Sequence, residues 1–410
     1  MSLVLRLSIL LLIIVIVEFY FFRKGISTAK YIFPKTHSKK VNLITASVIF
    51  YFNLYAIIGI GFLLYYSVSG VRPSFPPDNI LFDLFIQFPF WIFVSYVVQC
   101  IILFLPMDIL RIILFPLYKS KREIVKKLVY KIQFALLLGF MIYVPARIAF
   151  DYFAVSTRIV EFEKENLPAR LEEFKIVFIS DVQADKYTNP ARLERFINKV
   201  NEVNPDLVLV AGDIITSTPK YINQGAEYLG KIKSKYGVYS CVGDHDNWAY
   251  REDTKRSLRE IASALMSKNV EMVDNQKRII NADSTKIGIT FVTNTYVEKI
   301  NNDFLDSLTN GKFQTDLKIF LTHQPRRFLI DEARNKNYDL FLAGHTHGGQ
   351  LTFFFPFYNL SPTLFETKYV RGDFQFDNML AIVTRGLGMS LVPLRYNSTP
   401  EVTVIILKGK

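Results

Sequence analysis

The stretch that best indicates the fold of this chain and the kind of ligand that it binds is Gly344-His345-Thr346-His347-Gly348-Gly349-Gln350. Two imidazoles flank one threonine between glycines, an arrangement that serves no obvious packing need. Histidine is scarce in this chain, with five in 410 residues, so two in one turn stand out. Because imidazole is the commonest metal ligand in proteins, we interpret the stretch as part of a metal site.

Other side chains of the kinds that bind metals occur in four short motifs upstream. These are Asp181-Val182-Gln183, Gly212-Asp213, Gly243-Asp244-His245-Asp246 and Thr322-His323-Gln324-Pro325. Short apolar runs precede the metal-type residues, as buried strands would. The runs that we predict as strands are 175–179, 206–210, 237–242, 317–321 and 339–343.

Helical patterns lie between these runs, at residues 189–201 and 253–268. Strands that alternate with helices and end at polar residues predict an α/β domain with its site at one edge of the sheet. We expect this domain to cover residues 174–410, which is long enough for one substantial core. Residues 151–173, which mix aromatic and charged residues, are expected to form a tether.

The N-terminal region, residues 1–150, predicts a helical membrane anchor. Residues 42–71 and 84–107 contain no charge, and each stretch exceeds the roughly 20 apolar residues that span a bilayer. Residues 7–22 and 128–150 are two further candidates, so we predict about four spans. The first could instead be a signal peptide, but it ends in Glu-Phe-Tyr-Phe-Phe-Arg-Lys rather than in a small-residue cleavage site.

Basic residues predict how this anchor is oriented. Residues 23–40 hold six Lys or Arg and residues 111–131 hold seven, whereas the loop between them has only Arg72. By the positive-inside tendency, both basic segments are cytoplasmic. With four spans, we expect a multi-pass protein of the inner or plasma membrane whose α/β domain is extracytoplasmic. Glu18 should face the helix bundle, because a charge that faces lipid is costly.

The formal net charge of +12 belongs almost entirely to the anchor. Residues 1–150 carry a net +11 and the remainder carries +1. This distribution suits loops that face anionic lipid, so we expect no nucleic-acid binding. Cys100 and Cys241 lie far apart in the chain and imply no disulfide framework.

The motifs supply what a phosphoester hydrolase needs. Two divalent metals about 3.5–4 Å apart neutralise an anionic substrate and lower the pKa of a shared water, which gives a metal-bridged hydroxide that attacks phosphorus. We predict Asp213 as the bridging carboxylate and His245, backed by Asp246, as the acid for the leaving group. The predicted terminal ligands are Asp181, Gln183, Asp244, His323, His345 and His347.

This ordered set resembles the signature of the calcineurin-like metallophosphoesterases. Gly344–Gln350 is similar, more narrowly, to the bacterial membrane-associated phosphodiesterase branch of that family, and so are Thr384–Gly388, Pro393–Tyr396 and Pro400–Thr403. The resemblance covers roughly residues 170–408. It implies a four-layer α/β/β/α sandwich with a dinuclear site at the strand ends, and a metal-dependent phosphodiesterase or phosphatase.

The resemblance also implies how the ligands are shared. One metal would be held by Asp181, Gln183 and His347, and a second by Asp244, His323 and His345, with Asp213 between them. His245 would protonate the leaving group or steady the transition state, and Asp246 would orient its ring.

Two positions depart from the family pattern. Gln183 stands where the family usually has His, and Asp244 stands where it usually has Asn. The first change replaces an imidazole nitrogen with a neutral amide oxygen and the second adds a negative charge, so together they make the site harder and more anionic. We therefore expect two divalent ions with Mn²⁺ favoured, and Mg²⁺, Fe²⁺ or Zn²⁺ as alternatives. Asp185 is an alternative ligand in place of Gln183.

Location beside a bilayer favours a lipid-linked or cell-envelope phosphoester as the substrate. A hydrolase of soluble nucleotides or other small phosphoesters is the nearest alternative, and a catalytically degenerate membrane protein that binds phosphate is another. Arg385 and Arg395 are candidate substrate-binding residues, because arginine matches phosphate bidentately, although ordinary salt bridges would also use them. Residues 353–358, Phe-Phe-Phe-Pro-Phe-Tyr, either dip into the bilayer or form a buried strand and turn.

Overall fold

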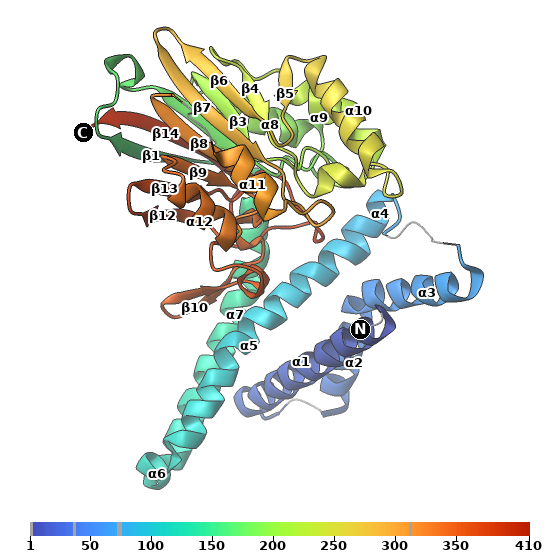
Figure 1. Cartoon of the computed structure of the whole chain (residues 1–410). Coiled ribbons are helices and arrows are strands. Elements are labelled where there is room, and N and C mark those ends of the chain that lie inside the picture. The colour runs from blue at the N-terminus through green and yellow to red at the C-terminus, as the bar shows by residue number, and fades with distance from the viewer. Residues whose placement is uncertain (1–2, 36–37, 72–75, 311–313) are drawn as a thin grey trace. The chain divides into compact units, whose positions relative to one another are not determined.

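The computed structural model describes residues 3–35, 38–71, 76–310 and 314–410. Its contacts divide the chain into two compact units. The first unit comprises Met1–Ala149 and Phe353–Leu360, and the second comprises Phe150–Thr352 and Ser361–Lys410. The elements are labelled in Figure 1.

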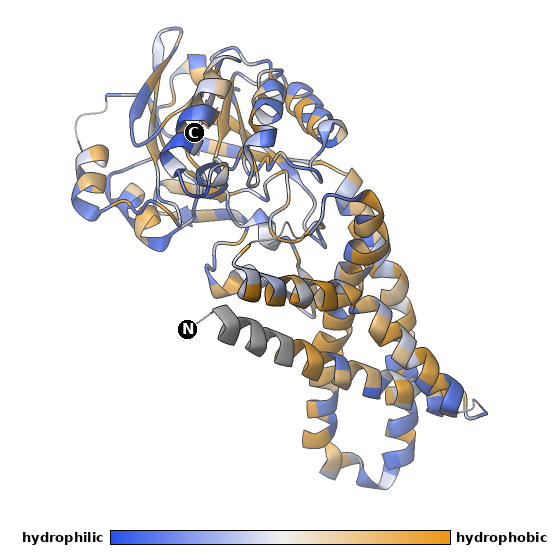
Figure 2. Cartoon of the chain, turned by 90° about the vertical axis from the view of Figure 1, so that its right-hand side faces the viewer, coloured by the Kyte–Doolittle hydropathy of each residue, from blue (hydrophilic) through white to orange (hydrophobic). Residues whose placement is uncertain are grey.

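Helices make up most of the first unit, and Figure 2 shows that apolar residues (orange) dominate them. They are α1 (Leu3–Ile32), α2 (Ser38–Phe52), α3 (Leu54–Ser69), α4 (Ile80–Phe82), α5 (Phe88–Ile113), α6 (Phe115–Tyr118) and α7 (Arg122–Phe153), whose end enters the second unit. A π-helical turn, Asp83–Gln87, joins α4 to α5.

Among the described residues, two helical stretches are long and apolar enough to cross a membrane, Ile80–Ile113 and Phe115–Phe153. Helices α2 and α3 add a third only if they count as one span, because they meet at a 48° bend. Within the described part of the chain, length and composition therefore give two or three candidate spans, and the four predicted spans stay a prediction. The predicted span 7–22 lies within α1, whose side chains are described only from residue 13, and Arg72 lies outside the described residues.

The bend between α2 and α3 falls at Asn53, which also explains the place of Glu18. The Asn53 Nδ2 donates to both carboxylate oxygens of Glu18, at 3.1 and 2.9 Å. Glu18 therefore has a polar partner on a neighbouring helix, as the cost of a lipid-facing charge predicts.

Two six-stranded mixed sheets form the framework of the second unit. Their strand orders are β1-β14-β2-β3-β4-β5 and β12-β13-β9-β8-β7-β6. The strands of the first sheet are β1 (Ser156–Lys164), β14 (Glu401–Gly409), β2 (Lys175–Ile179), β3 (Leu207–Val210), β4 (Val238–Ser240) and β5 (Val270–Met272). Those of the second are β12 (Gly372–Phe376), β13 (Met379–Val383), β9 (Leu340–Ala343), β8 (Leu317–Thr322), β7 (Thr285–Val292) and β6 (Lys277–Ala282).

The predicted α/β character is confirmed. All five predicted strands are present, as β2, β3, β4, β8 and β9, and both predicted helices are present, as α8 (Pro190–Asn201) and α10 (Thr254–Met266). The side chains of Asn189 and Asp253 cap these helices by accepting from Arg192 N and Arg256 N. The segment expected as a tether differs, because it contains β1, which pairs in parallel with β14 from Ser156 to Lys164.

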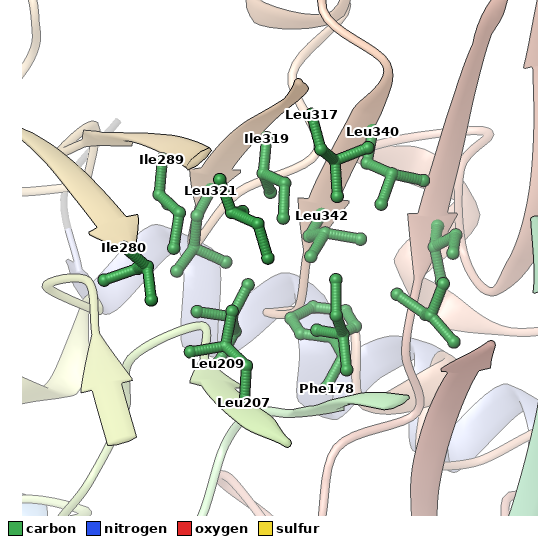
Figure 3. Close-up of a cluster of buried hydrophobic side chains, with 14 of the residues drawn as sticks. Phe178, Leu207, Leu209, Ile280, Ile289, Leu317, Ile319, Leu321, Leu340 and Leu342 are labelled. Atoms are coloured by element: carbon green, nitrogen blue, oxygen red, sulfur yellow. The ribbon is translucent and has the colours of Figure 1, made fainter. Parts of the chain in front are cut away.

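Three buried clusters join the sheets and helices of this unit. One cluster draws on both sheets, through side chains such as Leu209 and Leu321 (Figure 3). A second packs α8, α9 (Ile222–Leu229) and α10 on the first sheet, and a third packs α11 (Asn302–Thr309) and α12 (Arg327–Asn335) on the second. Burial on this scale, about 1.5–3 kcal/mol for each large apolar side chain, gives a rigid frame for the loops that follow the parallel strands.

Candidate metal centre

The loops after β2 and β3 bring Asp181 and Asp213 together. The Asp181 amide donates to the Gly212 carbonyl at 3.0 Å, and the Gln183 amide donates to the Asp213 carbonyl at 2.9 Å. Asp181, Gln183 and Asp213 have φ of +53°, +51° and +58°. Such a conformation costs a non-glycine residue about 1–3 kcal/mol, and strain of this kind clusters at functional sites.

Glycines allow this close approach. A Cβ at Gly243 would lie 2.2 Å from the Asp213 nitrogen and Oδ1. A Cβ at Gly386, where φ is +63°, would lie 2.7 Å from Asp181 Oδ2. The Gly388 amide also donates to the Asp181 carbonyl at 2.6 Å. The Thr384–Gly388 motif therefore packs against the first carboxylate of the site.

Two groups of side chains in the described residues have ligand atoms that all lie within 4.8 Å of one another. One group is Asp181, Asp213 and His323, and the other is Asp244, His323 and His345. His323 belongs to both, with its Nε2 3.4 Å from Asp213 Oδ2 and 3.3 Å from Asp244 Oδ2. The groups therefore lie side by side, as two neighbouring ion positions would require.

The ring of His323 is oriented by the backbone. Its Nδ1 lies 2.6 Å from the Ala211 carbonyl oxygen, where only an N–H makes a hydrogen bond. This partner leaves Nε2 facing the carboxylates, the arrangement typical of a metal-bound histidine. Burial lowers the pKa of His323, but Asp213 and Asp244 raise it well above its usual value. The same negative field favours a divalent cation.

His345 is shared between Asp244 and a residue that sequence reasoning missed. Its Nδ1 lies 2.9 Å from Asp244 Oδ2, and its Nε2 lies 3.1 Å from Glu366 Oε1. The Tyr296 hydroxyl and the Arg326 guanidinium also donate to that Glu366 oxygen, both at 2.5 Å. The hydrogen bond with His345 lowers the pKa of Glu366 to about 2. No motif surrounds Glu366 in the sequence, so no pattern marked it.

Gln324 matches the extra negative charge of Asp244. Its Nε2 donates to Asp244 Oδ1 and Oδ2, at 2.9 and 2.8 Å. Gln324 Oε1 accepts from Arg326 Nε at 2.8 Å and Asn294 Nδ2 at 3.2 Å, which fixes the orientation of the amide. Burial raises the pKa of Asp244, but the hydrogen bonds and charges of His323 and His345 lower it by a larger amount. The pKa of Asp244 therefore lies well below its usual range.

Among the described residues, the other half of the centre holds two oxygens without hydrogen-bond partners. Gln183 Nε2 donates to Asp213 Oδ2 at 2.8 Å. Within the described residues, Gln183 Oε1 and Asp181 Oδ1 are buried and have no hydrogen-bond partner. Leaving a buried polar group unsatisfied costs about 1–3 kcal/mol. A divalent cation would satisfy both oxygens, so these residues fit a metal.

His347 completes this half. Its Nε2 lies 3.4 Å from Asp181 Oδ1, and its Nδ1 lies 3.3 Å from Arg395 Nη2. Burial and the Arg395 charge lower the pKa of His347 well below its usual value. The ring is therefore neutral, which is the form that binds metal.

The predicted role of Arg395 in binding substrate is wrong. The side chain is 1% exposed. Its guanidinium donates to the carbonyls of Gly388, Arg385, His347 and Ser398. Those donors therefore hold the loops together. Arg385 Nε lies 3.3 Å from Glu401 Oε2 in an ordinary salt bridge. Neither arginine is among the residues that line the cavity described below.

Asp246 does not orient the His245 ring, contrary to expectation. Its carboxylate accepts from the backbone amides of Gly243, Asp213 and Ile214, at 2.8 to 3.0 Å. The His245 ring instead lies between the Thr216 carbonyl, 2.5 Å from Nδ1, and Ser390 Oγ, 2.9 Å from Nε2. Asp246 therefore fixes the turns that carry Asp213 and Asp244.

Asp185 is engaged away from the two groups. Its carboxylate accepts from the Tyr187 and Thr188 amides and from Thr216 Oγ1. The structure therefore offers no support for Asp185 as a replacement ligand for Gln183.

A cavity of about 260 Å³ opens over the site. Asp213, Asp244, His245, His345 and His347 line it, whereas Asp181, Gln183 and His323 are not among the lining residues. Its other walls include apolar side chains that sequence reasoning did not assign, namely Trp248, Leu351, Pro362, Leu391 and Val392. A polar floor of carboxylates and imidazoles thus meets an apolar rim.

This fold, with carboxylates and imidazoles gathered at the ends of parallel strands, defines a metal-dependent phosphoesterase. The calcineurin-like phosphoesterase family model matches residues 174–349. The metallophosphoesterase YkuE of Bacillus subtilis (strain 168) is 30% identical over 247 residues, which cover 59% of this chain and 82% of that protein. The chain therefore belongs to the calcineurin-like phosphoesterase family.

Two other relatives extend the similarity. The metallophosphoesterase Cj0846 of Campylobacter jejuni is 27% identical over 302 residues, which cover 70% of this chain and 72% of that protein. A transmembrane protein with metallophosphoesterase domain from Danio rerio is 28% identical over 257 residues, which cover 61% of this chain and 56% of that protein.

Proposed function

We propose that this chain is a membrane-anchored, dinuclear-metal hydrolase whose substrates are lipid-linked or cell-envelope phosphoesters. The observation that carries the proposal is the combination of a cavity floor of carboxylates and imidazoles with an exposed apolar rim. Leu391, in the cavity wall, is 94% exposed, and Phe365, next to the lining residue Glu366, is 99% exposed. Contiguous exposed apolar patches mark contact with an apolar partner, and we propose that Leu391 and Phe365 belong to such a patch.

Leu391 is held in place by its loop. Gln350 Nε2 donates to the carbonyls of Ser390 and Val392, at 2.9 and 2.8 Å, and Gln350 Oε1 accepts from the Ser390 amide at 2.9 Å. Leu391 between them has φ of +62°, a conformation that a branched side chain rarely adopts. The last residue of the Gly344–Gln350 motif thus supports an ordered apolar tip over the cavity.

Two divalent ions fit the centre, with Mn²⁺ favoured because the proposed ligands are oxygen and imidazole donors and include no thiolate. The ligands that we propose are Asp181, Gln183 and His347 for one ion, Asp244, His323 and His345 for the other, and Asp213 between them. When bound, such ions neutralise phosphoryl oxygens and supply a water of lowered pKa.

His245 is the residue that we propose as proton donor to the leaving oxygen. With its Nδ1 hydrogen-bonded to the Thr216 carbonyl, the ring would transfer a proton from Nε2. Ser390 Oγ lies 2.9 Å from that Nε2, and both residues line the cavity. Ser390 therefore positions the ring from the same loop that carries Leu391.

The arrangement of the whole chain is part of the same proposal. We propose that the two sheets and their helices form an α/β/β/α sandwich, in which β1 joins the residues 174–410 that the sequence predicts, and that four spans in residues 1–150 place it on the extracytoplasmic face. The basic segments 23–40 and 111–131 support this orientation. Modification of introduced cysteines in intact cells tests it: a cysteine at exposed Met266 should react with an impermeant thiol reagent and one at exposed Leu117 should not.

The enzymatic proposal is tested on the full chain in nanodiscs, after metal removal and addition of Mn²⁺, Mg²⁺, Fe²⁺ or Zn²⁺. Substrates are a phospholipid and the water-soluble ester with the same headgroup, and His345→Ala is the inactive control. We expect metal-dependent turnover with preference for the lipid. Leu391→Asn should raise KM for the lipid alone. Equal kcat/KM for both esters in the wild type would instead favour the soluble-substrate alternative.

A further inference from the structure

A β-hairpin from the C-terminal half of the sequence belongs to the helical unit. Strands β10 (Phe353–Phe355) and β11 (Tyr358–Leu360) pair with each other, and the structure assigns them no other strand among the described residues. The hairpin is grouped with the first unit and contacts α5. It carries the Phe-Phe-Phe-Pro-Phe-Tyr sequence at 353–358.

Gln99 of α5 makes two hydrogen bonds with the backbone of Phe354 in this hairpin, and we call this pair of bonds the clasp. Gln99 Nε2 donates to the Phe354 carbonyl at 2.8 Å, and the Phe354 amide donates to Gln99 Oε1 at 2.9 Å. The Gln99 side chain, which is 0% exposed, thus takes the part of a neighbouring strand. It satisfies both polar groups that Phe354 presents on the outer edge of the two-stranded ribbon.

The position of Gln99 along α5 is as informative as its hydrogen bonds. It lies in the uncharged stretch between Asp83 and Asp108, nine residues before Asp108. At 1.5 Å per residue this is about 14 Å of helix, close to half of the roughly 30 Å hydrocarbon core. If Ile80–Ile113 crosses the bilayer, the clasp lies at a depth where water does not reach.

The tip of the hairpin points to the same environment. Phe357 has φ of +68° and is fully exposed, and it follows Pro356 in the turn. That turn position normally takes glycine or asparagine. Phe354 and Tyr358 are also exposed, by 50% and 57%. A strained turn that presents an aromatic ring outward is unfavourable in water and favourable in lipid.

We propose that the hairpin Phe353–Leu360 is embedded in the lipid bilayer beside α5, with acyl chains around Phe357 and with Gln99 replacing the hydrogen bonds that lipid cannot provide. Non-helical backbone at membrane depth is tolerated only where protein satisfies its polar groups. The clasp meets that condition for Phe354. The proposal is independent of the substrate and of the metal centre.

Site-directed spin labelling of the full chain in phosphatidylcholine–phosphatidylglycerol nanodiscs tests the immersion. Nitroxides are placed at Phe357→Cys, at Leu105→Cys on the exposed face of α5, and at Met266→Cys on the surface of α10. Cys100 and Cys241 are fully buried, so the unsubstituted chain is the blank. We expect positions 357 and 105 to favour collision with oxygen several-fold over collision with an aqueous nickel chelate, and position 266 to show the reverse.

A label at 357 that behaves like the one at 266 overturns the proposal, whichever way position 105 behaves. The clasp is tested in the Phe357→Cys background. Gln99→Leu, which keeps volume but loses both hydrogen bonds, should increase the mobility of the label. Ser95→Ala, a buried substitution one turn earlier on the same helix, should not. Equal mobility in both variants would show that Gln99 does not hold the hairpin.

Discussion

The two halves of the proposed metal centre are supported by different means. The half with Asp181 and His347 is held mainly through the backbone. Hydrogen bonds join the loops after β2 and β3, glycines allow these loops to approach closely, and the buried Arg395 donates to backbone carbonyls. The half with Asp244 and His345 is held by side chains, among which Gln324 donates to both oxygens of Asp244.

Each half also contains one departure from the family pattern, and the structure treats them differently. Asp244 has a matched donor in Gln324, whereas Gln183 keeps an oxygen without a partner among the described residues. Asp244 therefore has a donor of its own within the protein, whereas Gln183 Oε1 keeps, among the described residues, the capacity to bind the metal ion that we propose.

Asp213 lies where the halves meet, and its substitution should have the largest effect. Asp213→Asn removes the charge shared by both ion positions. We expect kcat to fall by more than about 100-fold. Substitution of a residue that only supports a metal ligand already lowers metal affinity or activity by about 10- to 100-fold. Metal content by mass spectrometry should fall with it. Asp185→Asn, at a nearby carboxylate that accepts from the Tyr187 amide and Thr216 Oγ1, is the matched control and should keep its metal; loss of metal there would restore Asp185 as a ligand.

Asp244→Asn tests the half that is held by side chains. It restores the usual family residue, yet the new amide would face the Gln324 amide, whose orientation is fixed by Arg326 and Asn294. We expect kcat/KM to fall by about 10- to 100-fold, the range for disturbed ligand support.

The double variant Asp244→Asn/Gln324→Glu supplies the matching acceptor and should recover most of that loss. A double-mutant cycle measures the coupling. If the two losses simply add, Gln324 does not compensate for Asp244.

Sequence reasoning identified the site residues that stand in a recognisable local pattern. Asp181 and Asp213 follow short apolar runs, and parallel strands end at a common edge, so their meeting was predictable. Gln324 and Glu366 were missed because their roles depend on folding. Gln324 meets a carboxylate 80 positions away, and Glu366 meets Tyr296 from 70 positions away.

The fold shows the same division between local pattern and tertiary pairing. Apolar runs predict β2, β3, β8 and β9, whereas β1 shows no such run, because only Val160 and Phe162 of its nine residues are buried. Pairing with β14 makes it a strand. Hydropathy predicts residues 42–71 as one span, whereas the structure has a 48° bend at Asn53, a residue that donates to Glu18, 35 positions away in the sequence.

Glu366→Gln should weaken the side-chain half more mildly. The carboxylate, whose pKa lies near 2, stays ionised throughout the working pH range and anchors His345 Nε2. A neutral amide keeps the shape but loses the charge, so we expect about tenfold weaker metal binding at that position. Titration of the metal-free chain with Mn²⁺ measures this. Glu260→Gln, a surface control that pairs with Arg256, should leave the affinity unchanged; an equal change in both would indicate a general charge effect.

Gln183→His should have the smallest effect on rate and the most specific effect on metal. An imidazole replaces the amide oxygen that lacks a partner, and imidazole favours Zn²⁺ relative to an oxygen donor. We expect turnover within about tenfold of wild type, because six of the seven proposed ligands remain, and a shift of preference from Mn²⁺ towards Zn²⁺. The fit is close, because Gln183 Cβ lies 2.4 Å from where a Cβ on Gly388 would be, so melting temperatures are compared first. A folded variant that changes neither metal preference nor rate would show that Gln183 is not a ligand. In that case the two halves would differ in ligand number as well as in support.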